Sequence, residues 1–246
     1  MTTLARHPSA DSQTARSGER GFTLIELSIV LVIIGLLIGG ILQGQEMINN
    51  TRLKSTVAQV DAITAAVQTF QDKYRALPGD APNAVSTVLG ATVLGAGVAN
   101  GDGIIEAAAA GAVALGTTAI ANSTESAVVF NQLAAANLLQ GVDNLGAGQV
   151  NSTMQAAVGN GAAFDVATFA FGAPLGNRLG VRIRTGTAAA PTAFMSSEAM
   201  FSLDQRYDDG NGITGRWRDG AGAACFTGGA YVAGAAAACL PHVSIR

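Results

Sequence analysis

Apolar residues are spread unevenly along this chain, and the densest run lies near the N-terminus. From Phe22 to Leu42 there are 21 residues with a single charge, at Glu26. A helix of that length is about 31 Å long, which matches the hydrocarbon core of a bilayer. The run therefore predicts a membrane-spanning helix. A carboxylate inside such a segment is expensive to bury, so Glu26 is a candidate functional residue.

The helical periodicity continues beyond this run, but with only one apolar face. Between residues 43 and 76, apolar side chains recur every three or four positions and polar residues separate them. This spacing predicts an amphipathic continuation of the helix, packed on a folded domain. Glycine costs about 1 kcal/mol in a helix interior, so we expect the glycines between 35 and 44 to be points where the helix bends or melts. Pro78 and Gly79 predict its end. The apolar face comprises Val57, Val60, Ile63, Val67, Phe70 and Tyr74.

Two short helices are predicted farther along the chain. Asn122, with Glu125 three residues later, has the spacing of a capping box, and Gly141 predicts the end of that helix. A second helix is predicted to begin at Ser196. Its apolar face would carry Met200, Leu203 and Tyr207.

Strands are predicted only in the middle of the chain. Residues 164–171 are rich in aromatic and β-branched side chains, and in residues 179–185 Val181 and Ile183 alternate with arginines. Both patterns are typical of strands. Residues 142–162 show no such period and are expected to form a loop.

Composition excludes one class of function. The chain has 246 residues, of which 49% are hydrophobic and 13% charged, and its formal net charge is −3. Nucleic-acid binding relies on a clustered basic face, which this sequence lacks. No nucleic-acid partner is therefore expected. The length left after a long helix suits a single globular head.

The only two cysteines, Cys225 and Cys239, lie close to the C-terminus. An even number of cysteines in a domain exported to an oxidising space indicates one disulfide. The alternative is two free buried thiols. A zinc site is disfavoured, because His242 alone does not complete a set of four ligands.

Two short acidic segments have the oxygen side chains that Ca²⁺ prefers. The candidate ligands are Asp208, Asp209 and Asn211, and the alternative is a helix end followed by a tight turn. A second segment runs from Asn100 to Gly103, with Glu106 after it, and is expected to be a plain turn. No other cofactor is expected.

The sequence offers little for catalysis. Apart from His7 in the first 20 residues, the only histidine is His242, four residues from the end. Ser/His/Asp and Cys/His systems need an oriented histidine beside the nucleophile. The chain also lacks a glycine loop with lysine for phosphates and a dinucleotide fingerprint. We therefore expect a protein that is not an enzyme.

The stretch Gly21-Phe22-Thr23-Leu24-Ile25-Glu26 and the apolar run after it resemble the N-terminal signal of type IV pilins and type II secretion pseudopilins. The resemblance implies that a prepilin peptidase cuts between Gly21 and Phe22 and that Phe22 is then N-methylated. It also implies that Glu26 pairs with the N-terminal amine of a neighbouring subunit. Pairing lowers the cost of burying both charges in lipid. The alternatives are a cleaved signal peptide, with Gly39-Gly40 as the cleavage site, and a plain single-span anchor.

The same resemblance implies a layout and a location. Residues 1–21 would be a cytoplasmic leader that is removed, 22–42 a transmembrane and polymerising half-helix, 43–76 its amphipathic half and 77–246 a periplasmic or extracellular head. The arginines before the apolar run favour that orientation in the inner membrane. The fold class would be α+β and pilin-like: a long helix on a small antiparallel sheet, with short extra helices and a C-terminal disulfide loop.

The expected role is a structural subunit of a pilus or secretion pseudopilus, minor or specialised because the head is large. The alternative is a recognition pilin at the filament tip, and a catalytic head is the least favoured class. The implied partners are the prepilin peptidase, other pilin or pseudopilin subunits contacted through the N-terminal helix, the inner-membrane assembly platform and membrane lipid.

Overall fold

The computed structural model contains two compact units, residues 1–47 and 48–246, and each is described by itself. The helix α1 (Leu24–Tyr74) passes through both. The residues whose structure is described are 21–81, 99–105, 125–143, 153–159, 161–170, 177–186, 191–192, 195–220, 225–232 and 239–245.

In the first unit, α1 exposes its apolar side chains. Every residue from 21 to 47 is exposed, including Ile33 at 51% and Leu36 at 73%. The helix does not melt at the glycines, because α1 is one helix without a break from Leu24 to Tyr74. Leucine, which is among the better helix formers, occupies several positions around the glycines and favours the continuous helix.

In the second unit, the apolar face of α1 is buried as the periodicity predicts. Val60, Ile63 and Phe70 are each 0% exposed, and the Phe70 ring lies 4.6 Å from the partly buried Tyr74 ring, centre to centre. The helix ends at Tyr74, and Arg75 adopts a left-handed conformation with φ of 58°. Pro78 follows three residues later and cannot continue a helix.

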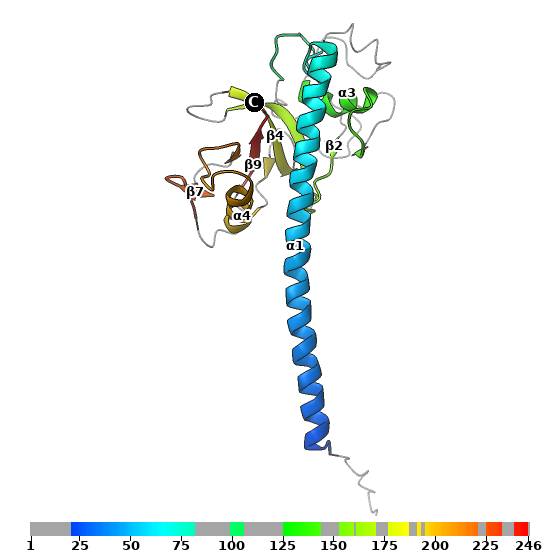
Figure 1. Cartoon of the computed structure of the whole chain (residues 1–246), viewed down its shortest axis with the longest axis vertical. Helices are drawn as coiled ribbons and strands as arrows, with labels where there is room; N and C mark the ends of the chain where they lie inside the picture. Colours follow the sequence, from blue (N-terminus) through cyan, green and yellow to red (C-terminus); the bar gives the residue numbers. More distant parts are fainter. Residues whose placement is uncertain are drawn as a thin grey trace, which may run out of the picture. The chain divides into compact units, whose positions relative to one another are not determined.

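The central sheet has four main strands in the order β3 (Ala163–Ala170), β4 (Asn177–Gly186), β9 (Pro241–Ser244) and β6 (Trp217–Asp219), all antiparallel. Figure 1 shows β4 and β9, the two inner strands, beside each other. β3 and β4 confirm the strands predicted at 164–171 and 179–185. The other two were not predicted, and one of them, β9, lies inside the sheet between β4 and β6. The C-terminal segment is therefore part of the core.

Neighbouring rows of this sheet point to opposite faces. One register row consists of Val166, Val181, Val243 and Trp217, which belong to the same core as the buried face of α1. Successive residues in a strand alternate between faces, so the next row points away from that core. It comprises Asp165, Arg182, His242 and Arg218, all buried.

Short strands supplement the sheet. β1 (Val142–Asp143) pairs with β2 (Thr153–Met154), so the prediction of an uninterrupted loop over 142–162 is wrong. Two residues are too few to show a period of two, which is why the pattern gave no signal. β5 (Pro191–Thr192) pairs with β4, and β7 (Phe226–Thr227) pairs with β8 (Ala230–Tyr231).

The first short helix differs from its prediction. A 3₁₀ turn, η1 (Glu125–Ala127), precedes α3 (Val129–Ala135), whose N-cap Val128 makes no side-chain capping bond. The predicted cap, Asn122, lies outside the described residues. The helix ends at Ala135 rather than at Gly141, because Asn137 already takes a left-handed φ of 57°.

The second short helix confirms its prediction. In α4 (Ser197–Tyr207) the side chain of Ser196 accepts a hydrogen bond from the Ala199 N–H at 3.3 Å. Met200 and Leu203 are buried, whereas Tyr207 is 41% exposed because it is the last residue of the helix. The long helix, antiparallel sheet, short helices and C-terminal disulfide confirm the expected α+β fold.

Candidate processing and assembly site

The start of α1 is fixed by a reciprocal pair of side chains. The Thr23 N–H and hydroxyl both donate to Glu26 Oε2, at 2.9 and 2.8 Å, and the Glu26 N–H donates to Thr23 Oγ1 at 3.3 Å. This is a capping box, which satisfies backbone donors at the helix start. Glu26 was predicted as a functional residue, whereas this role of Thr23 was not predicted, although Thr-x-x-Glu is the spacing that signals it.

The predicted processing residues lie immediately before the helix. Gly21 and Phe22 are non-helical, and Phe22 is 81% exposed. Within the described residues, α1 is the only helix that is long and apolar enough to cross a membrane, judged by length and composition alone. The peptide bond after Gly21 is therefore accessible and is followed directly by a membrane-compatible helix.

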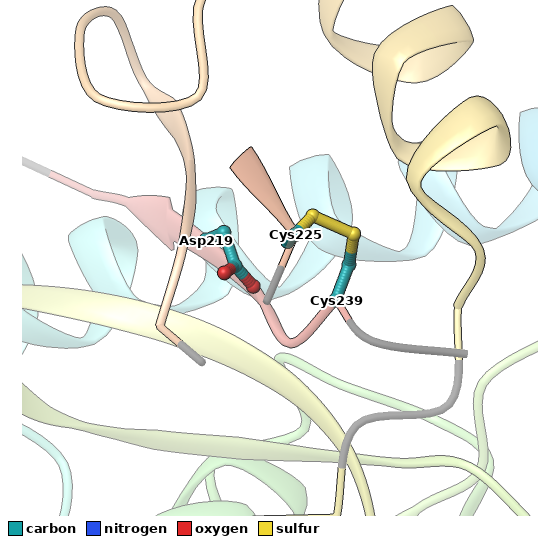
Figure 2. A group of neighbouring side chains, drawn as sticks. All are labelled: Asp219, Cys225 and Cys239. Carbon is teal, nitrogen blue, oxygen red and sulfur yellow. A yellow bond between two sulfur atoms is a disulfide. The ribbon is translucent and has the colours of Figure 1, made fainter. Parts of the chain in front are cut away.

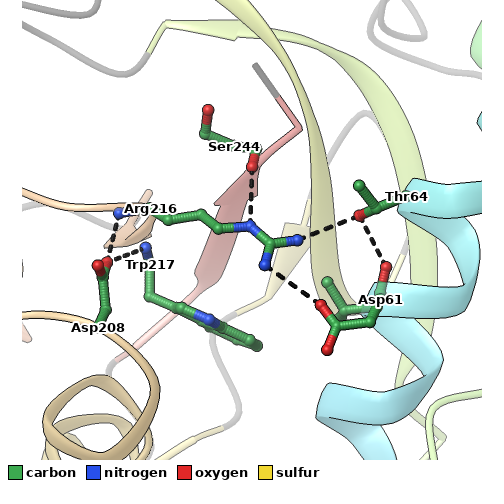
Figure 3. Close-up of polar contacts among 7 residues, drawn as sticks. Asp61, Thr64, Asp208, Arg216, Trp217 and Ser244 are labelled. Atoms are coloured by element: carbon green, nitrogen blue, oxygen red, sulfur yellow. Dashed lines mark hydrogen bonds and ion pairs between the residues drawn. The ribbon is translucent and has the colours of Figure 1, made fainter. Parts of the chain in front are cut away.

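A single arginine joins the second half of α1 to the sheet (Figure 3). Arg216 Nη1 lies 3.2 Å from Asp61 Oδ1, and Arg216 Nη2 donates to Thr64 Oγ1 at 3.3 Å. Its Nε donates to the Ser244 carbonyl at 3.1 Å. The pair with Asp61 is exposed and contributes little energy by itself. Its effect is to fix which face of α1 meets the edge of the sheet.

Asp208 holds the backbone that carries Arg216. Its Oδ2 accepts the N–H groups of Arg216 and of Trp217, the latter at 2.7 Å (Figure 3). Gly215 has a φ of +70°, and a Cβ there would collide with the Asp208 carboxylate. The turn therefore requires glycine at this position.

The predicted calcium ligands are only partly brought together. The carboxylates of Asp208 and Asp209 gather with that of Asp204, with oxygens within 4.8 Å of one another. Asn211 is engaged elsewhere, because its Oδ1 accepts the Ile213 N–H at 3.2 Å. Asp204 was not predicted, although it lies one helical turn before Asp208. Calcium binding here stays a prediction.

Asp204 is the buried member of this group. The pKa of Asp204 is raised to about 6. Burial is the largest cause, and the negative charges of Asp208 and Asp209 add to it, whereas the hydrogen bond from Tyr231 lowers the pKa. The Tyr231 hydroxyl donates to Asp204 Oδ2 at 2.7 Å. This bond ties β8 to α4.

Cys225 and Cys239 form a disulfide, which confirms the prediction of one disulfide rather than two free thiols (Figure 2). Asp219 lies beside it. The bonded sulfurs are not thiolate ligands, so this group offers no zinc site. Cys239 also pairs with Met195 through backbone hydrogen bonds, just before α4.

The turn at 100–103 has a structural partner. The buried Asp80 carboxylate accepts the N–H groups of Gly101 at 2.6 Å and Gly103 at 2.7 Å. Asn100 and Asp102 bond to each other. Glu106, the remaining acidic residue of the pattern, lies outside the described residues. The observed bonds make this segment a turn that is held by Asp80, in the stretch that follows α1.

His242 is placed for packing. Its ring stacks on Phe169 with centres 4.7 Å apart, and a Cβ at Gly220 would collide with it. Burial, followed by the charge of Arg182, lowers the pKa of His242 to about 3. The imidazole is therefore neutral at physiological pH.

Comparison with known families identifies the N-terminal segment. Residues 16–42 match the prokaryotic N-terminal methylation motif. The chain carries the prepilin-type signal of type IV pilins and pseudopilins. No curated protein and no solved structure matches the chain.

The motif confirms the resemblance drawn from Gly21, Phe22 and Glu26, all of which lie inside the matched residues. It supports a pilin-like or pseudopilin-like subunit and implies processing by a prepilin peptidase and assembly with other pilin subunits. A structural subunit of this kind is not an enzyme. The apolar helix is consistent with a membrane anchor.

Proposed function

We propose that this chain is a minor or specialised subunit of a type IV pilus or a type II secretion pseudopilus. The observation that carries the proposal is the methylation motif at residues 16–42, which runs directly into the exposed apolar half of α1. A subunit needs a peptidase cleavage signal to be processed and an apolar helix after it to be assembled. The large head, 77–246, favours a specialised rather than a main subunit.

Cleavage between Gly21 and Phe22 would create a new amine next to Thr23. In lipid, an amine and a carboxylate each lower the burial cost of the other when they are paired. We propose that Glu26 pairs with the amine of a neighbouring subunit and so sets the register of the helices. The capping box holds the carboxylate at the helix start until that partner arrives.

The topology follows from the same segment. Residues 1–21 would stay in the cytoplasm until cleavage, 22–42 would span the inner membrane, and the head would face the periplasm. The disulfide in the head is consistent with an oxidising compartment. From the membrane, the assembly platform would move the subunit into the filament.

A recognition role at the filament tip is the second candidate. One observation favours it: Phe201, Tyr207 and Ile213 are each about two-fifths exposed, and all three lie on α4 or in the turn after it. Exposed apolar side chains concentrated on one segment favour contact with a partner. Copy number in purified filaments, together with binding by the filament tip, would separate this role from a purely structural one.

The decisive experiment is the mass of the mature protein after co-expression with a prepilin peptidase. We expect a chain that begins at Phe22 and carries one N-methyl group. Replacing Gly21 with Val should block cleavage without removing the membrane helix. A chain that begins after Gly40, or one that keeps its leader beside an active peptidase, would overturn the proposal.

A further inference from the structure

A cavity of the head lies beside α1, at the start of α4. It has a volume of about 320 Å³ and is open to solvent. Its polar lining residues are Asn49 and Arg52, from α1, and Ser196, from the turn before α4. None of them belongs to the methylation motif at residues 16–42. The apolar wall of the cavity consists of Leu53, Val158 and Met195.

Arg52 brings an unpaired positive charge to this cavity. In the described part of the chain, its guanidinium makes no hydrogen bond or ion pair, whereas Arg216 is paired with Asp61. A Cβ at Gly159 would lie 3.9 Å from Arg52 Nη1, so the glycine leaves space beside the guanidinium. A guanidinium binds a carboxylate through two parallel hydrogen bonds. The cavity therefore suits a carboxylate that has apolar carbon next to it.

The turn after α4 has the opposite charge and no cation to balance it. Carboxylate oxygens of Asp204, Asp208 and Asp209 lie within 4.8 Å of one another. The groups that donate to Asp208 and Asp209 are neutral: backbone N–H groups and the Thr214 hydroxyl. Within the described residues, no arginine or lysine forms an ion pair with any of the three. Like charges at such distances repel, so a cation from outside would stabilise the group.

Apolar side chains flank the acidic turn. Tyr207 before it is 41% exposed and Ile213 after it is 43% exposed. Asp209, between them in sequence, is exposed as well. Two glycines, Gly210 and Gly212, keep this segment narrow because they carry no side chain. The turn thus presents a carboxylate beside exposed apolar carbon, which is the complement of what the cavity presents.

One copy does not bring its own turn to its own cavity. The cavity lies at Ser196, just before α4, and the acidic turn begins at Asp208, just after it. The 11 residues of α4 hold the two apart by about 16 Å, because an α-helix rises 1.5 Å per residue. Contact between them therefore joins two copies head to tail. Such a contact repeats from copy to copy and builds a ring or an open filament.

We propose that the turn 208–213 of one copy docks in the cavity beside Arg52 of a second copy of this chain. Arg52 donates to the Asp209 carboxylate of the second copy, and Ile213 packs on the apolar wall at Leu53. The inference rests on the proposed assembly into a filament. It goes beyond that function by assigning the surfaces of the head through which copies of this subunit stand next to each other.

The test is zero-length cross-linking between copies that carry different isotopes. Full-length Arg52→Lys keeps the charge and supplies a primary amine. It is made with light and with heavy nitrogen, and both forms are co-reconstituted in phosphatidylcholine vesicles without divalent cations. A carbodiimide then joins amines to carboxylates in close contact, and mass spectrometry identifies the linked peptides. We expect links from position 52 to the turn 208–213 that combine a light and a heavy peptide, which only two copies can form.

Lys54 is the matched control in the same sample. It is exposed, has the same amine and does not line the cavity. We expect mixed-isotope links from Lys54 to the turn to be at least about fivefold fewer than those from position 52. Links that contain only one isotope would show contact within a single copy and would overturn the proposal. Equal mixed linking from Lys54 would indicate general attraction and would overturn it too, as would the absence of any link from position 52.

The apolar part of the contact is tested in the same assay. Ile213→Ser, added to Arg52→Lys, should lower the mixed-isotope links about fivefold, because it removes apolar surface that the cavity would bury. Ile104→Ser changes a side chain that is 47% exposed and lies outside the turn, so the links should change less than about twofold. Equal losses would show that the turn does not dock through Ile213. Cleavage after Gly21 and filament incorporation are scored in separate samples, so failure of the proposed function is distinguished from failure of this contact.

Discussion

The two halves of α1 differ in the exposure of their apolar side chains. Ile33, in the first half, is 51% exposed, whereas Ile63, in the second, is 0% exposed. The first half is apolar on every side, and a helix of that type must be covered by lipid or by other helices. The second half has one apolar face, which its own head covers. The difference shows that the head buries the apolar side chains of only the second half of the helix.

The halves also differ in their polar contacts. In the first, Glu26 bonds within its own turn, to Thr23. In the second, Gln59 reaches the segment after β2 and bonds both the Gln155 carbonyl at 3.1 Å and the Ala157 N–H at 2.8 Å. Asp61 reaches Arg216 across more than 150 residues of sequence. Polar residues of the second half therefore orient the head, whereas the observed hydrogen bonds of Glu26 stay within its own turn.

The largest expected effect on stability comes from truncating one isoleucine in each half of α1 to alanine. Ile63→Ala removes buried methyl groups from a packed core and should destabilise the head by about 2–5 kcal/mol. Ile33→Ala, at an exposed position, should leave thermal unfolding of the head unchanged and act only on assembly. Unfolding is followed through the fluorescence of the buried Trp217. Equal shifts in melting temperature for the two variants would contradict the comparison.

Local pattern was sufficient for the long elements. The extent of α1, both long strands β3 and β4, and the start of α4 at Ser196 follow from periodicity and capping, which involve residues close in sequence. The strands β6 and β9 escaped prediction because they have three and four residues and carry the polar side chains of Arg218 and His242. Those side chains are buried by packing from distant segments, which no local window contains.

The residues of the candidate site also differ in whether their local sequence predicts them. Glu26 was predictable because one charge in an apolar run is conspicuous. The predicted calcium ligands Asp208, Asp209 and Asn211 are neighbours in sequence, whereas the fold groups Asp204 with Asp208 and Asp209. The Arg216 contacts depend on α1, β6 and β9 meeting in space. A residue whose partners lie in three elements gives no signal in its own neighbourhood.

The second prediction concerns Glu26. Glu26→Gln keeps the size of the side chain and removes its charge, so cleavage and membrane insertion should persist while incorporation into filaments falls at least about tenfold. Glu46→Gln, on the same helix but outside the apolar run, serves as the control and should assemble normally. Subunits are counted in sheared filaments by immunoblotting. Normal assembly of Glu26→Gln would remove the proposed pairing with a neighbouring amine.

The third prediction asks whether an ion helps to fix the turn that holds Arg216. If Asp204, Asp208 and Asp209 bind Ca²⁺ with the weak affinity of extracellular sites, 10 mM Ca²⁺ should add about 1.4 kcal/mol to stability for a dissociation constant near 1 mM. Differential scanning calorimetry would show a raised melting temperature with Ca²⁺ but not with Mg²⁺. Asp209→Asn should abolish the shift and Asp102→Asn, at another exposed acidic position, should not. An identical response in wild type and Asp209→Asn would exclude the site.

The smallest effect is the pH dependence of Asp204, measured without Ca²⁺. Its folded pKa, about 6, lies above the ordinary value of 3.8. The folded state therefore holds this proton more tightly than the unfolded state, and stability from this group declines as pH rises from about 4 to 6. Asp204→Asn keeps an acceptor for Tyr231 without a charge, so its stability relative to wild type should be greater at pH 7 than at pH 5, by an amount on the order of 1 kcal/mol. The comparison is made from melting temperatures at the two pH values. A difference that did not vary with pH would contradict the raised pKa, because a carboxyl with the same pKa in the folded and unfolded states contributes no pH dependence to stability.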